Sequence, residues 1–240
     1  ILCYNKLGDT MKILLLFISI IPVFLLGYYI YQKDREKEPK SLLLVLFSSG
    51  LLSAFLVITV NVLIAIFFPD FYLATQYYKF NFFELFILIF LEIALVEELS
   101  KWLMIRLIGY SSNAFDQQYD IIVYSVFVAL GFAMIENIFY VLNGGFGLGI
   151  YRAVFSVPGH VAFGVFMGYY LGIAKQQEVK NKVKYRVSML KSVLVPTLFH
   201  SLYNYLLMLE NIFYLFLFLV FIIVLFFSAY LKIDQISKED

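Results

Sequence analysis

The chain has 240 residues, of which 62% are hydrophobic and 15% are charged, and its formal net charge is +1. A typical soluble domain has about 45–50% apolar and about 25% charged residues, so one soluble core could not bury this much apolar surface. We therefore predict an all-α, polytopic transmembrane helical bundle. A transmembrane barrel would show alternating strands of about ten residues instead of long apolar runs. The single cysteine, Cys3, excludes an internal disulfide and a multi-cysteine metal site, and no basic patch suggests a nucleic-acid partner.

A membrane-spanning helix needs roughly 20 apolar residues, and about seven segments of the chain meet this requirement. The first has the basic start and apolar run of a signal peptide, but no small-x-small cleavage site follows it, so we expect a retained span. The last two segments meet around Glu210-Asn211 with almost no linker, which predicts a tight helical hairpin. The seven segments are 12–31, 42–68, 80–108, 119–142, 149–174, 190–209 and 211–231.

These spans form one predicted membrane domain over residues 11–232. Residues 1–10 precede a methionine that looks like a natural start, and we expect them to be a non-native or disordered extension; residues 233–240 form a predicted cytoplasmic tail. Lysine and arginine concentrate in the loops 32–41 and 175–189 and near the C-terminus, which share one side of the membrane if there are seven spans. Basic loops stay in the cytoplasm, so we expect the N-terminus outside and the C-terminus inside.

The third segment carries two adjacent carboxylates and a lysine inside an apolar run. Glu97 and Lys101 are four residues apart and share one helix face, so they can pair. A buried ion pair that only fixes helix packing would explain one glutamate and one lysine, but it explains the adjacent Glu98 less well. Neighbouring carboxylates repel, which tends to leave an acid beside a base. In the same segment, Glu84 lies near the outer end and Glu92 is expected to face elsewhere, so we leave both out of the site.

Three later segments also carry polar residues at depth. Glu136 and Asn137 lie far from both ends of their helix, where Asn137 alone would be typical of a helix–helix hydrogen bond. His160 follows a Pro-Gly pair that can loosen a helix. His200 and Asn204 are four residues apart on one face, which by itself is a weak motif.

Depth makes these clusters informative together. Counted from the presumed cytoplasmic ends, Glu97, Glu136, His160 and His200 lie roughly 14–26 Å into the membrane, near its middle. Titratable side chains at this depth are costly unless they are paired or face water, so they indicate function. We therefore predict a polar active site near mid-bilayer. Arg152, eight residues before His160, is either an outer-end anchor or a partner for a site carboxylate.

At this point the motifs resemble those of the PrsW-type intramembrane proteases, relatives of the type II CAAX prenyl endopeptidases. EELSK resembles the E-E-x-x-K motif of this family. Four further features also match, and together they extend over about residues 20–210. They are the charged first loop ending in Glu-Pro, the F-x-x-x-E-N motif, a third motif with an arginine eight residues before its histidine, and H-x-x-x-N. Ile121 and Ser125 stand where the family often has glycine or small residues. The prenyl endopeptidases have histidine where this chain has Glu136, which favours the PrsW branch. The matching segments are KDREKEPK, FDQQYDIIVYSVFVALGFAMIENIFY, RAVFSVPGHVAFGVFMGYYLG and PTLFHSLYNY.

The resemblance implies an intramembrane glutamic endopeptidase without a cofactor. In this interpretation Glu97 or Glu98 activates a water as general base. We favour Glu97, oriented by Lys101, with Glu98 in contact with a second helix. His160 and His200 position the water or donate a proton, Asn204 stabilises the oxyanion, and Glu136 shuttles protons or pairs with a histidine. Glu136 and Asn137 belong to the same motif. The implied partner is a single-span membrane protein such as an anti-sigma factor, in the plasma membrane of a bacterium.

Two alternatives stay open at this point. Two histidines and several carboxylates could instead hold zinc with one open position for water, although no H-E-x-x-H spacing is present. Charged residues at the membrane midplane and loosened helices are also typical of ion-coupled transporters, although no inverted repeat is visible. A non-catalytic scaffold of protease ancestry would not be expected to keep every polar position.

Overall fold

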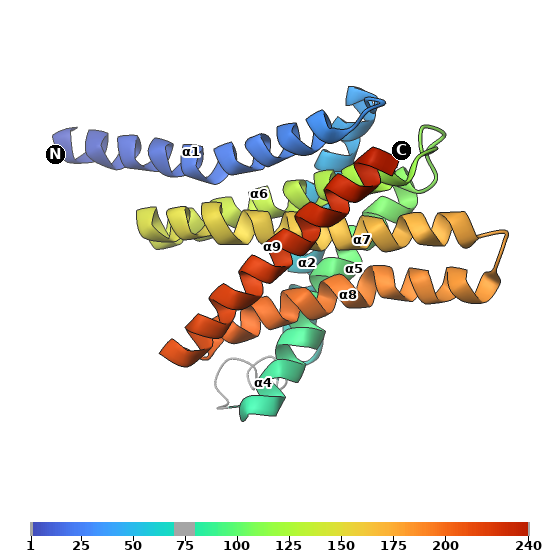
Figure 1. Cartoon of the computed structure of the whole chain (residues 1–240). Helices are drawn as coiled ribbons and strands as arrows, with labels where there is room; N and C mark the ends of the chain where they lie inside the picture. Colours follow the sequence, from blue (N-terminus) through green and yellow to red (C-terminus); the bar gives the residue numbers. More distant parts are fainter. Residues whose placement is uncertain (1, 70–79, 240) are drawn as a thin grey trace.

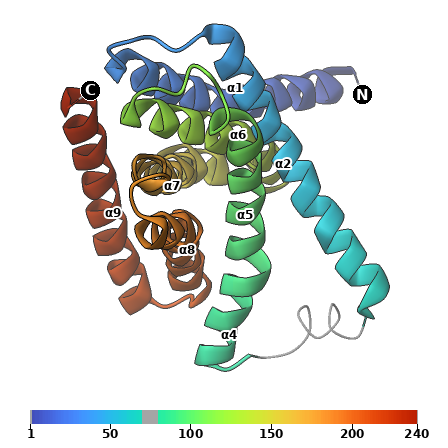
Figure 2. The same cartoon turned by 90° about the vertical axis from the view of Figure 1, so that its right-hand side faces the viewer.

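The computed structural model describes residues 2–69 and 80–239, with side chains described from Ile13 onward, and every regular element in these ranges is a helix. Figures 1 and 2 show the helices packed as one bundle. The predicted extension 1–10 and tail 233–240 include Ile1 and Asp240, which lie outside the described residues. The division into a domain over 11–232 with an extension and a tail stays a prediction. In chain order the elements are α1 (Leu2–Lys33), α2 (Lys40–Phe67), α4 (Phe82–Leu88), η1 (Ile89–Ala94), α5 (Leu95–Met104), η2 (Ile105–Gly109), α6 (Gln118–Tyr151), η3 (Arg152–Ser156), α7 (Val157–Gln177), α8 (Lys182–Met208) and α9 (Ile212–Glu239).

Local chemistry explains several helix ends. The Asn181 side chain accepts hydrogen bonds from the backbone of Val183 and Lys184 and so caps the start of α8. Between α8 and α9 the chain turns within three residues, and Glu210 adopts a left-handed conformation with φ of 43°. The Asn211 side chain then caps α9 by accepting from Phe213 N. The hairpin predicted around Glu210-Asn211 is therefore present.

Four helical stretches of the described chain are long and apolar enough to cross a membrane, namely Ile13–Lys33, Lys40–Phe67, Gln118–Gln177 and Ile212–Glu239. This count does not confirm the predicted number of about seven spans. The third stretch contains a fold-back at Gly145, where φ is 77° and the chain reverses so that α6 and α7 lie side by side (Figures 1 and 2). Residues 82–109 and 182–208 are helical too, but they carry several charged side chains.

The α6–α7 hairpin forms the centre of the molecule. In its most apolar part, 72% is buried inside the protein, compared with 22–28% in the corresponding parts of the first, second and last apolar helices. Those three helices expose large apolar side chains on their outer faces. Glycines let α2 and α6 approach closely, because a Cβ added at Gly131 would lie 2.1 Å from the Phe47 carbonyl oxygen. Small residues at such crossings are typical of packed membrane helices. Figure 2 shows α5, α8 and α9 placed around this centre.

Candidate active site

The bundle brings polar side chains from four helices together. Glu97, Glu98 and Lys101 come from α5, and Glu136 comes from α6. His160 comes from α7, while His200 and Asn204 come from α8. Short π-helical turns, η1 and η3, directly precede α5 and α7, and such turns are frequent at functional sites. The clusters identified in the sequence therefore form one site, apart from Asn137.

Glu98 is the most enclosed carboxylate of the site. It is fully buried, and its Oε1 lies 2.7 Å from Lys101 Nζ and 2.9 Å from His200 Nδ1. A carboxylate that accepts at Nδ1 places the ring hydrogen there, so the other ring nitrogen, Nε2, is left for other partners. Glu98 therefore links α5 to α8 and orients His200, as expected for a contact with a second helix.

Glu97 faces the same cluster with a free oxygen. Its Oε2 lies 3.7 Å from Lys101 Nζ and 3.9 Å from His200 Nε2, and it is buried without a hydrogen-bond partner among the described residues. Both distances are too long for direct hydrogen bonds. We expected Lys101 to orient Glu97, but the lysine lies closer to Glu98. The i,i+3 pair is the short one, although both glutamates are within reach on the same side of α5.

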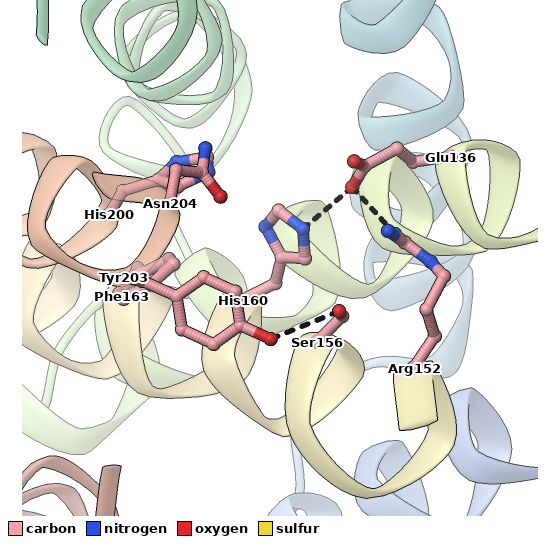
Figure 3. Close-up of a pocket in the computed structure, with 8 residues that line it drawn as sticks. All are labelled: Glu136, Arg152, Ser156, His160, Phe163, His200, Tyr203 and Asn204. Atoms are coloured by element: carbon pink, nitrogen blue, oxygen red, sulfur yellow. Dashed lines mark hydrogen bonds and ion pairs between the residues drawn. The ribbon is translucent and has the colours of Figure 1, made fainter. Parts of the chain in front are cut away.

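A second chain of contacts runs through His160. Its Nδ1 lies 3.2 Å from Lys101 Nζ, and its Nε2 lies 2.8 Å from Glu136 Oε2. The same Glu136 oxygen lies 3.0 Å from Arg152 Nη2 (Figure 3). The sequence left open whether Glu136 pairs with a histidine and whether Arg152 pairs with a carboxylate, and the structure shows both contacts.

Asn137 points away from the cavity. Its Nδ2 donates to the Ser19 carbonyl oxygen of α1 at 2.9 Å, and its Oδ1 accepts from Arg152 Nε at 2.9 Å. The Asn137 side chain thus makes a hydrogen bond between two helices, which was the structural alternative for this position. It also accepts a hydrogen bond from Arg152. The structure does not bring Asn137 into contact with the other residues proposed for catalysis.

Glu136, His160, His200 and Asn204 line a small cavity, whereas the α5 residues Glu97, Glu98 and Lys101 are not among its lining residues. The space not filled by atoms amounts to about 260 Å³, part of it open to the outside. Figure 3 shows His160, Glu136 and Arg152 along one wall with His200 and Asn204 along another. Tyr203 and Ser156 share a hydrogen bond of 3.1 Å beside them. The sequence analysis did not select Ser156, Phe163 or Tyr203. Ser156 lies one helical turn before His160, so i,i+4 spacing could have identified it; the flat ring of Phe163 stacks on His200 at 4.9 Å.

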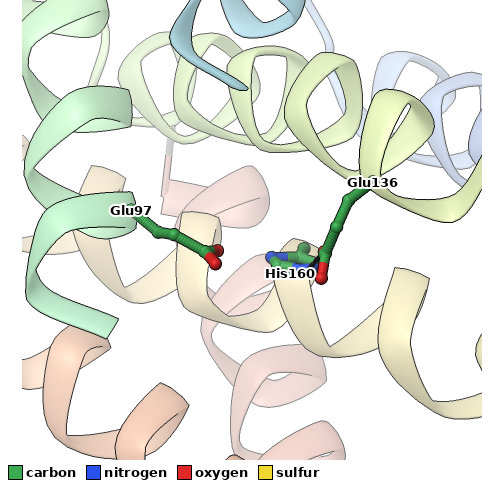
Figure 4. A group of neighbouring side chains, drawn as sticks. All are labelled: Glu97, Glu136 and His160. Carbon is green, nitrogen blue, oxygen red and sulfur yellow. Dashed lines mark hydrogen bonds and ion pairs between the residues drawn. The ribbon is translucent and has the colours of Figure 1, made fainter. Parts of the chain in front are cut away.

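The donor set of the site also fits a metal ion by its chemistry. Glu97, Glu136 and His160 each offer one ligand atom, and these atoms all lie within 4.8 Å of one another. Figure 4 shows the two carboxylates approaching His160 from opposite sides. One histidine and two carboxylates are ligand types found at catalytic zinc sites. The same groups already contact cations, however, because Arg152 lies on Glu136 and Lys101 lies near Glu97 and His160.

Buried carboxylates and histidines around a cavity, inside a bundle of apolar helices, are typical of a membrane-embedded enzyme. The chain belongs to the PrsW protease family, since the model of the family described as "PrsW family intramembrane metalloprotease" matches residues 38–230. Protease PrsW of Oceanobacillus iheyensis is 37% identical over 189 residues, which cover 79% of this chain and 80% of that protein. Protease PrsW of Clostridioides difficile is 35% identical over 238 residues, which cover 95% and 92%. That of Bacillus subtilis is 39% identical over 135 residues, which cover 55% and 61%.

No solved structure matches the chain. The family membership confirms the prediction of a membrane-embedded peptidase, and it favours this class over an ion-coupled transporter.

Proposed function

We propose that this peptidase cleaves membrane-protein substrates with a water activated by Glu97. The observation that carries the proposal is the free, buried Oε2 of Glu97, which faces His200 Nε2 at 3.9 Å. Glu98 Oε2 is also buried without a hydrogen-bond partner among the described residues, but Glu98 is held through Oε1 by Lys101 and His200, and Glu136 is held by Arg152 and His160. Glu97, in contrast, has no ion-pair contact shorter than 3.7 Å. A general base needs an unengaged lone pair within reach of the water from which it takes a proton.

The proposed reaction balances without a further reactant. Glu97 takes a proton from water while the water oxygen attacks the scissile carbonyl carbon. The Asn204 amide, a neutral donor that lines the cavity, stabilises the negative oxygen that forms. When the intermediate collapses, the C–N bond breaks and the leaving amine takes the proton from Glu97. His200 Nε2 holds the attacking water, and Glu98 fixes the orientation of His200.

His160 acts in this proposal as a positioning group. Both of its ring nitrogens are engaged, one beside Lys101 and the other on Glu136. It therefore fixes one wall of the cavity, while Arg152 holds Glu136 in place through a 3.0 Å contact. The role of Lys101 is to compensate the charge of Glu98 at a depth where an unpaired carboxylate would be costly.

The topology that we propose has seven crossings in the plasma membrane of a bacterium. They are α1, α2, the helical stretch 82–109, α6, α7, α8 and α9, with the N-terminus outside and the C-terminus in the cytoplasm. The two chain ends lie at opposite ends of the bundle in Figure 1, and the basic connection between α7 and α8 lies on the same side as the C-terminus. An N-terminal tag that is protected from protease in right-side-out cells would contradict this orientation.

The substrate that we propose is a single-span membrane protein such as an anti-sigma factor. Purified wild-type protein in detergent should cleave such a substrate, whereas Glu97→Gln and His200→Ala should not. Glu92→Gln is the matched control, because it makes the same chemical change in the same helical stretch at a position with no hydrogen bond or ion pair to a site residue among the described residues. Full cleavage by the Glu97→Gln variant would refute the proposed base, and cleavage of unrelated single-span proteins at the same rate would refute the substrate class.

A zinc hydrolase is the second candidate, favoured by the close approach of three potential ligands. Glu97, Glu136 and His160 would hold the ion, which would lower the pKa of a bound water and polarise the scissile carbonyl. The contacts of Lys101 and Arg152 with these ligands favour the metal-free reaction, because two cations already compensate the carboxylates. Elemental analysis of purified protein and cleavage in the presence of a chelator separate the two. Stoichiometric zinc together with chelator-sensitive cleavage would overturn the metal-free proposal.

A further inference from the structure

A buried tyrosine directly after η2, Tyr110, has two cations close to its ring. The ring of Tyr110 has Arg106 Cζ at 4.0 Å and Lys175 Nζ at 4.9 Å. Tyr110 is only 3% exposed, and its hydroxyl oxygen is buried without a hydrogen-bond partner among the described residues. An unpaired buried hydroxyl is costly. The arrangement therefore indicates a partner that accepts a hydrogen bond and that the protein itself does not supply.

The two cations on the Tyr110 ring favour an anion as this partner. Arg106 makes no ion pair within the described part of the chain, and its guanidinium only stacks on Tyr110 and Trp102. Lys175 has Glu178 at 3.8 Å, and both side chains are about two-fifths exposed, so this pair neutralises little charge. Burial raises the pKa of the Tyr110 hydroxyl above its ordinary value, so the hydroxyl keeps its proton and can donate it. Two cations, from η2 and from α7, thus lie on the ring of a tyrosine whose hydroxyl can donate a hydrogen bond.

An apolar stripe lies next to these donors on the same helix. Leu99, Leu103 and Leu107 follow one another at intervals of four residues, which places them on one helix face. Their side chains are exposed by 45%, 39% and 65%. Arg106 is three residues after Leu103 and directly precedes Leu107, so its charge stands at the end of this exposed face. A charged group above an exposed apolar stripe matches a phospholipid, with its phosphate beside the cations and an acyl chain along the leucines.

We propose that Arg106, Tyr110 and Lys175 bind the phosphate headgroup of an anionic phospholipid at the basic end of the bundle. The exposed lysines of the neighbouring connection, Lys180 and Lys182, raise the local concentration of such lipids. Arg106 follows α5, which carries Glu97, and Lys175 lies near the end of α7, which carries His160; Figure 2 shows α5 beside α7 and α8. The bound headgroup thus joins the ends of two helices of the active site.

The only tryptophan of the chain reports on this site. Trp102 lies one helical turn before Arg106, with the guanidinium carbon 5.9 Å from its ring, and its indole N–H donates to Ser192 Oγ at 2.9 Å. The full chain is reconstituted in phosphatidylcholine vesicles that contain a minor fraction of lipid with brominated acyl chains, either phosphatidylglycerol or phosphatidylcholine. Brominated phosphatidylglycerol should quench Trp102 fluorescence more strongly than the same fraction of brominated phosphatidylcholine. The ratio of the two within each variant cancels changes in the environment of the tryptophan.

The variants separate a built site from general surface charge. Arg106→Gln and Lys175→Gln should each lower the preference for phosphatidylglycerol about fivefold, and Tyr110→Phe should lower it less, because only the hydroxyl is lost. Lys180→Gln removes the same charge from an exposed position without contact to Tyr110 and should keep most of the preference. If Arg106→Gln does not fold, Lys175→Gln and Tyr110→Phe still test the site.

Two results would overturn the lipid site. The first is equal quenching by both lipids in the wild type, or an effect of Lys180→Gln as large as that of Lys175→Gln. The second is loss of the preference when inorganic phosphate is added at physiological concentration, which would assign the donors to a soluble anion. The quenching does not depend on catalysis, so the lipid site and the role of Glu97 can fail separately.

Discussion

Glu97 and Glu98 are neighbours in sequence, but their surroundings predict opposite effects of substitution by glutamine. Glu98→Gln removes the charge that compensates Lys101, which is 1% exposed, and weakens the contact that orients His200. Removing one partner of a buried ion pair costs about 3–5 kcal/mol, because the other charge stays buried. At about 2–4 °C per kcal/mol for a protein of this size, the melting temperature should fall by about 6–20 °C.

Glu97→Gln should leave the fold nearly unchanged. The Glu97 Oε2 accepts no hydrogen bond within the described structure, and its nearest cation lies 3.7 Å away and already binds Glu98. A neutral amide of almost the same shape should change the free energy of unfolding by less than about 1 kcal/mol. Cleavage, in contrast, should fall by about 10²–10⁴-fold, the usual contribution of a general base.

The two variants are compared by thermal unfolding in detergent and by cleavage of a single-span substrate, with Glu92→Gln as the control. We expect Glu97→Gln to be stable and inactive, Glu98→Gln to be both less stable and less active, and Glu92→Gln to match the wild type. The reasoning is refuted if Glu98→Gln unfolds at the wild-type temperature, or if Glu97→Gln loses as much stability as Glu98→Gln. Either result would mean that the charge of Lys101 is compensated differently.

Three further predictions concern the rest of the molecule. The Glu38 carboxylate accepts a hydrogen bond from Tyr124 at 2.5 Å, and burial raises its pKa to about 7. The pKa in the unfolded chain is about 4.3. Glu38 therefore contributes its full stability below about pH 4.3 and loses this contribution as the pH rises to about 8. Glu38→Gln should flatten this fall in melting curves recorded across the pH range. Gly131→Ala should cost about 1–3 kcal/mol in thermal unfolding, since its Cβ would meet the Phe47 carbonyl oxygen, whereas Gly147→Ala meets open space and should be neutral. Arg152→Met should reduce kcat with little change in KM. In a Glu136→Gln background, the same substitution should reduce kcat much less, and additive losses of kcat would contradict the coupling of Arg152 and Glu136.

The sequence predicted the helices better than their ends. Segment 80–108 corresponds to the helical stretch 82–109, but segment 211–231 stops well before α9 ends at Glu239. The apolar run ends near Leu231, whereas the helix continues because Ile233 and Ile236 still pack against the bundle. Hydropathy marks where a chain prefers lipid, and it does not mark where backbone hydrogen bonding stops. For the same reason the fold-back at Gly145 was predicted only as a gap between two spans.

The residues of the site could be selected from the sequence, but their partners could not. Spacing along one helix predicted that Lys101 can pair with Glu97, but it did not show that Glu98 is the closer partner. The contact of Arg152 with Glu136 depends on the register of the α6–α7 hairpin, which is set by the position of the turn at Gly145. Asn137 follows Glu136 in sequence but faces α1, because adjacent helical residues point about 100° apart.

The balance of charge in the site explains why one carboxylate is free to react. Among the described residues, Lys101 holds Glu98 at 2.7 Å and Arg152 holds Glu136 at 3.0 Å, so each cation is committed to one carboxylate. Glu97 is left with longer contacts only, at 3.7 and 3.9 Å. A charge without a close partner at membrane depth lowers the stability of the fold. If Glu97 served only in packing, an apolar residue at its position would make the fold more stable. The proposed role of Glu97 as a proton acceptor would account for a carboxylate at this position.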